Sequence, residues 1–241
     1  MNKNLSDTNK LAYITIILLI LEIITVTAPV VILRSTFDFP DILRKPAKDA
    51  FELFKQNESY IILGYYIFVI SSLLFIPMSY FLKQVYSLST NKIALEFLAG
   101  LGIATTIFQT LGFIRWIFVM PFLTENYFNN PENEKPIALI YETLNRFAGM
   151  SVGEHLGFIA MGSWVICLGI IILNHPNCSK WLGFTGILIG FLLIISVLEH
   201  FGGKLASIWG QVNFLSNTVF TFWLLWLSLS IWKLNKNQSL T

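Results

Sequence analysis

Six long runs of apolar residues limit the folds open to this chain more than any other feature. A helix needs roughly 20 apolar residues to cross a hydrocarbon layer of about 30 Å, and each run is about that long. The strands of membrane barrels alternate apolar and polar residues, whereas the run from Ile187 to Ile195 does not. Helices then remain as the way to satisfy backbone hydrogen bonds in lipid. The sequence therefore predicts an all-α, polytopic integral membrane protein with one domain over residues 1–241. The six expected spans are 11–33, 60–82, 94–122, 153–174, 181–200 and 211–232.

The composition supports a membrane protein and excludes other classes. Of the 241 residues, 55% are hydrophobic and 12% are charged, against roughly 25% charged in soluble domains. This balance excludes a soluble globular domain, and it excludes a disordered chain because disorder requires low hydrophobicity and high charge. The net charge is +2 and the Lys and Arg residues are scattered, so no nucleic-acid partner is expected. The expected partner is the lipid bilayer, and no cofactor is predicted.

The residues that flank the apolar runs predict on which side of the membrane the chain ends lie. The first run is long, contains Glu22 and lacks a small-x-small cleavage site, so it is expected to be an uncleaved span. Counting Lys and Arg gives seven in the segments on the side of the termini and eight on the other side, which leaves the positive-inside rule undecided. The acidic residues concentrate on the second side. On that basis we expect a multi-pass protein of the cell membrane with both termini cytoplasmic.

Two of the loops predicted outside carry amphipathic helical patterns. Pro46 suits a first helical position, and apolar residues recur at helical spacing through Asn57. A similar stripe follows Pro136, and Gly149 is expected to stop that helix. Both segments are predicted to be short interfacial helices on the membrane surface. The two apolar stripes are Ala47, Ala50, Phe51 and Phe54 in the first segment, and Ile137, Ile140, Leu144 and Phe147 in the second.

Glycines mark the faces on which these helices are expected to pack. Every fourth residue is glycine from Gly149 to Gly157, and the same spacing joins Gly186 to Gly190. Small residues at this spacing let two helix backbones approach closely in a membrane. The pattern predicts contact faces and does not identify a binding site.

Ionisable side chains inside a span are costly and usually have a partner or a function. The depth of these ionisable side chains in the membrane follows from three runs of 18 residues: 97–114 before Arg115, 156–173 after His155, and 181–198 before Glu199. At 1.5 Å per residue each run covers about 27 Å, so these groups are expected at one level near the outer membrane boundary. Glu22 lies 11 residues from each end of its run and is expected near the midplane. The predicted polar cluster at the outer boundary consists of Arg115, Glu154, His155, Glu199 and His200.

The cluster admits three interpretations, and the residues leave open whether the chain is an enzyme. In the first, Arg115 bridges Glu154 and Glu199 and holds three helices together, since a guanidinium can engage two carboxylates. In the second, the cluster is a small-ligand or ion site, and in a proton-coupled transporter the histidines would act as a switch together with Glu22.

In the third interpretation, the cluster holds zinc for a membrane-embedded hydrolase, with His155, His200 and Glu199 as candidate ligands. Adjacent helical residues point about 100° apart, so Glu154 and His155 are poorly placed to bind one ion together. Arg115 would also repel a cation. These two arguments make a metal the least favoured occupant.

Four segments carry a family resemblance: GFIRW at 112–116, PFL at 121–123, NRFAG at 145–149 and GEHLG at 153–157. With them the chain resembles a bacterial family of multi-span membrane proteins named the domain of unknown function 4386, and the resemblance covers most of the chain. It implies a six-helix bacterial membrane protein and supplies no activity. It makes Arg115, Arg146, Glu154 and His155 the first residues to test.

Overall fold

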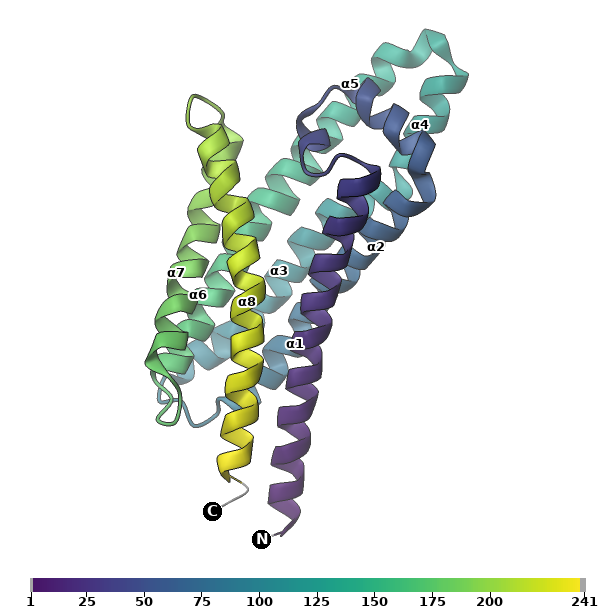
Figure 1. Cartoon of the computed structure of the whole chain (residues 1–241). Helices are drawn as coiled ribbons and strands as arrows, with labels where there is room; N and C mark the ends of the chain where they lie inside the picture. Colours follow the sequence, from purple (N-terminus) through teal and green to yellow (C-terminus); the bar gives the residue numbers. More distant parts are fainter. Residues whose placement is uncertain (1, 239–241) are drawn as a thin grey trace. The chain divides into compact units, whose positions relative to one another are not determined.

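The computed structural model describes residues 2–238, and within that range it is helical with no strand (Figure 1). Six helical segments are long and apolar enough to cross a membrane, and each of the six predicted runs overlaps one of them. The all-helical, six-span prediction is confirmed at this level. The six segments are Asn9–Thr36, Ala47–Val85, Lys92–Asn129, Pro131–Leu173, Lys180–Phe201 and Ala206–Lys236. The elements in chain order are α1 (Asn2–Thr36), η1 (Asp41–Arg44), α2 (Ala47–Val85), α3 (Lys92–Phe118), α4 (Met120–Asn129), η2 (Pro131–Asn133), α5 (Glu134–Leu144), η3 (Asn145–Leu156), α6 (Gly157–Leu173), α7 (Lys180–Ser196), η4 (Val197–Phe201) and α8 (Ala206–Gln238).

The chain divides into two compact units. Unit 1 consists of Met1–Ile23, Leu73–Thr106 and Gly157–Thr241, and unit 2 consists of Ile24–Ser72 and Ile107–Leu156. The boundary runs through α1, α2 and α3, and it falls between η3 and α6. The single domain expected over 1–241 stays a prediction, and residues 1 and 239–241 of it lie outside the described part of the chain.

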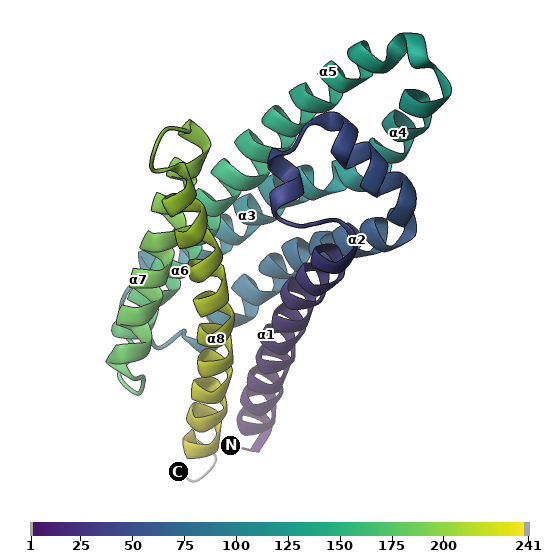
Figure 2. The same ribbon diagram turned by 45° about the horizontal axis from the view of Figure 1, so that its top comes forward.

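Glycine pairs hold α6 against α7 in unit 1. A side chain added at Gly162 would lie 2.5 Å from the Gly190 carbonyl oxygen, and one at Gly169 would lie 2.7 Å from that of Gly183. On each helix the two glycines are seven residues apart, which is about two helical turns. The antiparallel helices therefore touch through their backbones at two levels. Figures 1 and 2 show α7 beside both α6 and α8.

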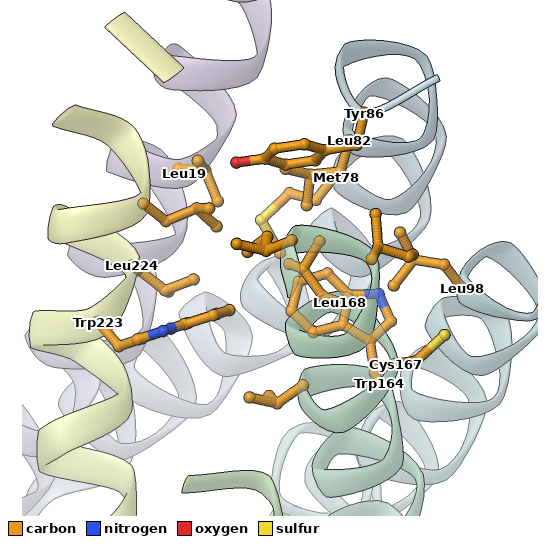
Figure 3. Packing of buried hydrophobic residues seen from close by; sticks show 14 of the residues in the cluster. Leu19, Met78, Leu82, Tyr86, Leu98, Trp164, Cys167, Leu168, Trp223 and Leu224 are labelled. Carbon is orange, nitrogen blue, oxygen red and sulfur yellow. The ribbon is translucent and has the colours of Figure 1, made fainter. Parts of the chain in front are cut away.

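Two buried tryptophans pack among the aliphatic residues of the unit 1 core. The Trp223 ring of α8 packs over Gly186, and its Nε1 donates to the Leu182 carbonyl oxygen at 3.0 Å. Trp164 is fully buried and donates to Ser79 Oγ at 2.7 Å. Figure 3 shows both rings among leucine side chains. Each indole N–H thus has an acceptor, as a buried indole requires.

In unit 2 the first amphipathic segment is a helix, as predicted. It begins at Ala47 and joins the rest of α2 across a kink at Asn57, whose φ of −131° and ψ of 24° are not helical. All four residues of its apolar stripe are buried, including Phe51 and Phe54. The non-helical backbone at Asn57 separates this helix from the helix that forms the second span, which agrees with the prediction of a separate segment.

The second amphipathic segment differs from the prediction. Gly149 does not stop a helix, because α5 continues through the π-helix η3 into α6. Ile137 is buried as expected, but Ile140 and Phe147 are exposed, and the buried partner of Ile137 is Tyr141. The predicted stripe assumes α-helical spacing, and the wider π-turns after Leu144 change which side chains share a face, which accounts for Phe147. Ile140 precedes those turns and lies on the exposed side of α5.

The glycine contacts of α6 and α7 give a first prediction. Gly162→Ala and Gly190→Ala should each lower the free energy of unfolding by about 1–3 kcal/mol, because a methyl group meets a backbone oxygen that cannot rotate away. Thermal unfolding in lipid nanodiscs measures this. Gly100→Ala on α3, where a side chain meets nothing within 4 Å, is the matched control and should be neutral or stabilising. Equal effects at all three positions would contradict close α6–α7 packing.

Candidate functional site

The guanidinium of Arg115 lies at the centre of the polar groups in unit 2. Arg115 is in the last turn of α3 and its exposed fraction is 9%. Its Nη2 donates to Asn145 Oδ1 at 2.9 Å, and its Nη1 donates to the Gly112 carbonyl oxygen. Both acceptors are neutral. The hydrogen bonds fix the guanidinium without cancelling its charge.

Asn145 connects three elements at this point. It is the first residue of η3, and its Nδ2 donates to the Leu43 carbonyl oxygen of η1 at 3.0 Å. Asn145 therefore accepts a hydrogen bond from α3 through its amide oxygen and donates one to η1 through its amide nitrogen.

Three glycines allow η3 to lie against α3. A side chain added at Gly153 would come within 2.6 Å of the Gly112 Cα atom, and one at Gly149 would lie 2.7 Å from Arg115 Cζ. The predicted glycine face is thus the contact face of η3, and the Arg115 guanidinium occupies the space beside Gly149. Alanine at any of the three positions would separate the two helices or displace the guanidinium.

An aromatic group forms the other side of the site. Arg115 Cζ lies 5.1 Å from the ring centroid of Trp116, and the Tyr65 ring stacks on Trp116 at 4.9 Å with an interplanar angle of 9°. Tyr141 packs edge-on to the same indole at 6.3 Å. Tyr65 and Tyr141 are 1% and 3% exposed, and their hydroxyls have no hydrogen-bond partner among the described residues. Both phenol groups lie within electrostatic range of the Arg115 guanidinium.

Glu154 forms an ion pair with Arg44 of η1. The Nη2 to Oε2 distance is 2.8 Å, and the two side chains are 36% and 21% exposed. This differs from the predicted ion pair, in which Arg115 bridges Glu154 and Glu199. A loop folds back to bring Arg44 to the carboxylate, and helix depths alone do not reveal such a contact. We call the following residues the unit 2 cluster: Arg44, Tyr65, Arg115, Tyr141, Asn145 and Glu154.

The other predicted site residues lie elsewhere. His155 follows Glu154 on η3 and is half-buried, whereas Arg146 is exposed. Glu199 and His200 belong to unit 1, on η4, where the Glu199 carboxylate packs against Gly210 of α8. Glu22 on α1 is 1% exposed. The five-residue cluster expected at one level stays a prediction, because its members belong to two separate units.

The metal candidates are likewise divided between the units. Within residues 2–238 no group of three or more His, Cys, Asp and Glu side chains is placed to hold a metal ion. His155 belongs to unit 2, and His200 and Glu199 belong to unit 1.

Sequence reasoning missed four residues of the unit 2 cluster. In the sequence Tyr65 and Tyr141 are ordinary aromatic residues of apolar segments, and Asn145 stands out only as part of the segment at 145–149. A signal for Asn145 did exist, because it adjoins the Arg146 singled out by the resemblance. Arg44 was counted only as a loop charge, and no periodicity points to its contact with Glu154.

A second buried polar group, also missed, lies in unit 1 beside the loop between α6 and α7. His175 is buried and packs edge-on to Tyr86 at 5.6 Å. Its Nδ1 accepts from the Asn177 backbone N–H at 3.3 Å and lies 3.2 Å from Cys178 Sγ. Burial raises the pKa of the Cys178 thiol to about 11, so the thiol keeps its proton and can donate it to Nδ1. These bonds require neutral His175 with its proton on Nε2.

The electrostatics of this group also favour neutral His175. Burial lowers the pKa of the imidazole below its ordinary value, and the Lys180 ammonium lowers it further. The cysteines form no disulfide, since Cys167 and Cys178 are both free thiols.

Comparison with known proteins identifies a family and nothing more specific. The family model described as a domain of unknown function (DUF4386) matches residues 14–227. This match confirms the resemblance drawn from the four segments. Searches of curated proteins and of solved structures gave no match.

The bonds of Asn145 give a second prediction. Asn145→Ala removes the acceptor of Arg115 and the donor to Leu43, and it should lower the free energy of unfolding by about 2–3 kcal/mol. Chemical denaturation in detergent micelles measures the loss. Asn129→Ala at the exposed end of α4 is the control and should change little. A loss at Asn145 no larger than that at Asn129 would show that the Arg115–Asn145 bond does not hold unit 2 together.

The state of His175 gives a prediction about pH. Because the folded protein has the lower imidazole pKa, the unfolded chain binds more protons as pH falls through the ordinary value of about 6.5. The contribution of neutral His175 is complete above that pH and is lost below it. The unfolding temperature should therefore fall between about pH 8 and about pH 5. In His175→Asn, which keeps an acceptor for the Asn177 N–H, the fall should be smaller. The same fall in both proteins would exclude His175 as the cause.

Proposed function

Because the chain belongs to the DUF4386 family, whose description assigns no activity, we propose its function from the unit 2 cluster. The chain is a bacterial multi-pass membrane protein that binds a small ligand at Arg115, Tyr65 and Tyr141. The observation that carries this proposal is the pair of buried tyrosine hydroxyls beside Arg115 that have no hydrogen-bond partner among residues 2–238.

The cost of burying a hydroxyl supports a ligand over packing alone. A buried hydroxyl without a hydrogen bond costs about 1–3 kcal/mol. Phenylalanine would supply the same stacking on Trp116 without that cost. A cluster that only held helices together would thus gain from phenylalanine at both positions. A ligand that accepts hydrogen bonds from the tyrosines gives the hydroxyls a function.

The helix geometry gives separate support. Residues that position the site lie on η3, a π-helix of 12 residues, and π-turns occur often at functional sites. The Arg44–Glu154 ion pair is partly exposed, so the cluster has a polar side in contact with its surroundings. A polar ligand can approach from that side.

The proposal also includes a position in the membrane. The unit 2 cluster lies near the outer boundary of the cell membrane, and both chain termini are cytoplasmic. The helical segment 47–56 lies along the membrane surface as an interfacial helix, whereas α5 continues without a break into η3 and α6 and is not proposed as one. The buried Phe51 and Phe54, opposite the exposed charges of Lys48 and Glu52, support this placement for the first segment.

A proton-coupled transporter is the second candidate function. The observation that favours it is Glu22, a carboxyl group in the first span with an exposed fraction of 1%. Buried acids within spans are typical of proton-coupled carriers. The zinc-dependent hydrolase gains no comparable support, because no set of three potential ligands occurs in the described part of the chain.

Removing the two hydroxyls tests the proposed site. The dialysable small-molecule fraction of a bacterial lysate should raise the unfolding temperature of the wild type in nanodiscs, because a ligand of the folded state stabilises it by RT ln(1 + [L]/Kd). The double variant Tyr65→Phe, Tyr141→Phe should gain nothing. Without the fraction it should unfold at the wild-type temperature or above, since it loses only unpartnered hydroxyls.

Two exposed tyrosines of the same helix provide the matched control. Tyr60 and Tyr66 flank the site on α2 and are exposed, so Tyr60→Phe, Tyr66→Phe should respond to the fraction as the wild type does. An equal gain by the Tyr65, Tyr141 double variant and the wild type would exclude the hydroxyls as part of a binding site.

A further inference from the structure

Two adjoining hollows lie along α3 and α6 in unit 1, one apolar and one polar. The apolar groove has a volume of about 360 Å³ and is lined by Asn91, by residues of α3 between 93 and 101 and by residues of α6 between 163 and 170. The polar pocket has a volume of about 470 Å³ and is lined by Thr90, Asn91, Lys92, Ile93 and Asn174. Asn91 and Ile93 line both hollows, so the groove leads into the pocket. Every lining residue belongs to unit 1, and none belongs to the unit 2 cluster.

The apolar groove has small residues at its base and large ones at its rim. Ala94 and Cys167 are buried, and Cys167 Sγ donates to the Ala94 carbonyl oxygen at 3.1 Å, so α3 and α6 are in contact at the base. Ile93 and Phe97, one helical turn apart on α3, are 77% and 64% exposed. From Ile93 to Leu101 the groove follows α3 for about 12 Å. A narrow apolar chain can lie along such a groove between the two helices.

The polar pocket lies where two long apolar segments end. One segment able to cross a membrane begins at Lys92, and another ends at Leu173. The Thr90 backbone N–H donates to the Asn174 carbonyl oxygen at 3.5 Å, which brings these two ends together, and Figure 1 shows both loops at the same end of unit 1. Trp181, the second residue of α7, is 74% exposed, and exposed tryptophans are typical of the boundary between membrane and water.

The polar pocket attracts anions through two ammonium groups. Lys92 lines the pocket, and its Nζ donates to the Ser87 carbonyl oxygen at 2.7 Å. Nζ of Lys180 donates to the Leu173 carbonyl oxygen, one residue before Asn174. Each ammonium has three N–H groups and its described acceptor is neutral. Both lysines therefore keep N–H groups for an anion.

Among the described residues, no acidic side chain lines either hollow. Glu96 is the acid at this end of α3, and its carboxylate pairs with Lys83 at 2.7 Å. Basic pockets between membrane helices are typical binding sites for anionic lipid headgroups. An apolar groove that leads into such a pocket matches a molecule in which an apolar chain is joined to an anionic head.

We infer that the two hollows together bind one anionic phospholipid. One acyl chain lies in the apolar groove. The phosphate lies in the polar pocket beside Lys92, and Lys180 adds a second positive charge. Hydrogen bonds between ammonium and phosphate are charge-assisted and stronger than neutral ones. A free phosphate would leave the groove unused, and a zwitterionic headgroup would bring a cation close to the two lysines. Phosphatidylglycerol has the charge and the chains that the two hollows require.

Native mass spectrometry of the purified protein in detergent micelles tests the site, because it counts bound lipid molecules. Dioleoyl phosphatidylglycerol and dioleoyl phosphatidylcholine are titrated separately, since they share their acyl chains and differ in headgroup charge. We expect the first phosphatidylglycerol to bind with a Kd at least about tenfold lower than that of phosphatidylcholine. Equal Kd values for the two lipids would overturn the inference.

Lys92→Gln tests the polar pocket. It should raise the Kd of phosphatidylglycerol about fivefold and leave that of phosphatidylcholine unchanged, because only the anionic headgroup loses an opposite charge. Lys233→Gln on α8 is the matched control, since it removes an exposed lysine that lines neither hollow. Equal effects of the two substitutions on phosphatidylglycerol binding would exclude Lys92 as the headgroup site.

Ser163→Leu tests the apolar groove and provides the test if Lys92→Gln fails to fold. Ser163 lines the groove and is half-buried, so leucine there occupies the space of the acyl chain and should raise the Kd of phosphatidylglycerol about tenfold or more. Thr218→Leu adds the same bulk at an exposed position of α8 and should leave Kd unchanged. Equal Kd values in the two variants would contradict a chain in the groove. A dimer that Ser163→Leu dissociates, without selective lipid binding, would assign the groove to a second copy of the chain and overturn the inference.

Discussion

The hydrogen bond from Arg115 to Asn145 is the interaction on which the arrangement of unit 2 depends. An arginine with an exposed fraction of 9% in a lipid-length helix needs fixed acceptors, and Asn145 provides one while binding η1 through Leu43. The bond requires η3 to lie close to α3. Gly149 and Gly153 allow that approach, and the π-helical turns place both glycines on the contact face.

The two units use different means to hold helices together where lipid provides no hydrophobic driving force. In unit 1 the glycines of α6 and α7 bring backbones into contact, and the buried tryptophans, such as Trp223, have their N–H groups paired. In unit 2 a charged side chain occupies the interior beside stacked aromatic rings. Buried polar atoms without a hydrogen-bond partner among the described residues occur in both units, among them the Tyr86 hydroxyl in unit 1, but in unit 2 two tyrosine hydroxyls share one cluster with a buried arginine. This combination is the reason to place the function in unit 2.

Run length and glycine spacing were enough to predict six helical spans and the faces on which several of them pack. Both features are local, because whether a segment is helical and which face it packs on depend on residues within one or two turns. The end predicted at Gly149 was wrong, because glycine stops a helix in water but serves as a contact surface between helices in lipid. The Arg44–Glu154 ion pair could not be predicted, since it joins residues 110 apart through a folded-back loop. The tyrosine hydroxyls carry no sequence signal, because burial without a partner is a property of the folded chain.

An experimental structure of the protein purified from its membrane tests the central claim most directly, because it shows what lies against the buried hydroxyls. We predict a bound small molecule in contact with the Arg115 guanidinium and at least one of the hydroxyls of Tyr65 and Tyr141. A structure in which both hydroxyls bond to protein atoms or to water, with no other molecule beside Arg115, would contradict a ligand site in unit 2.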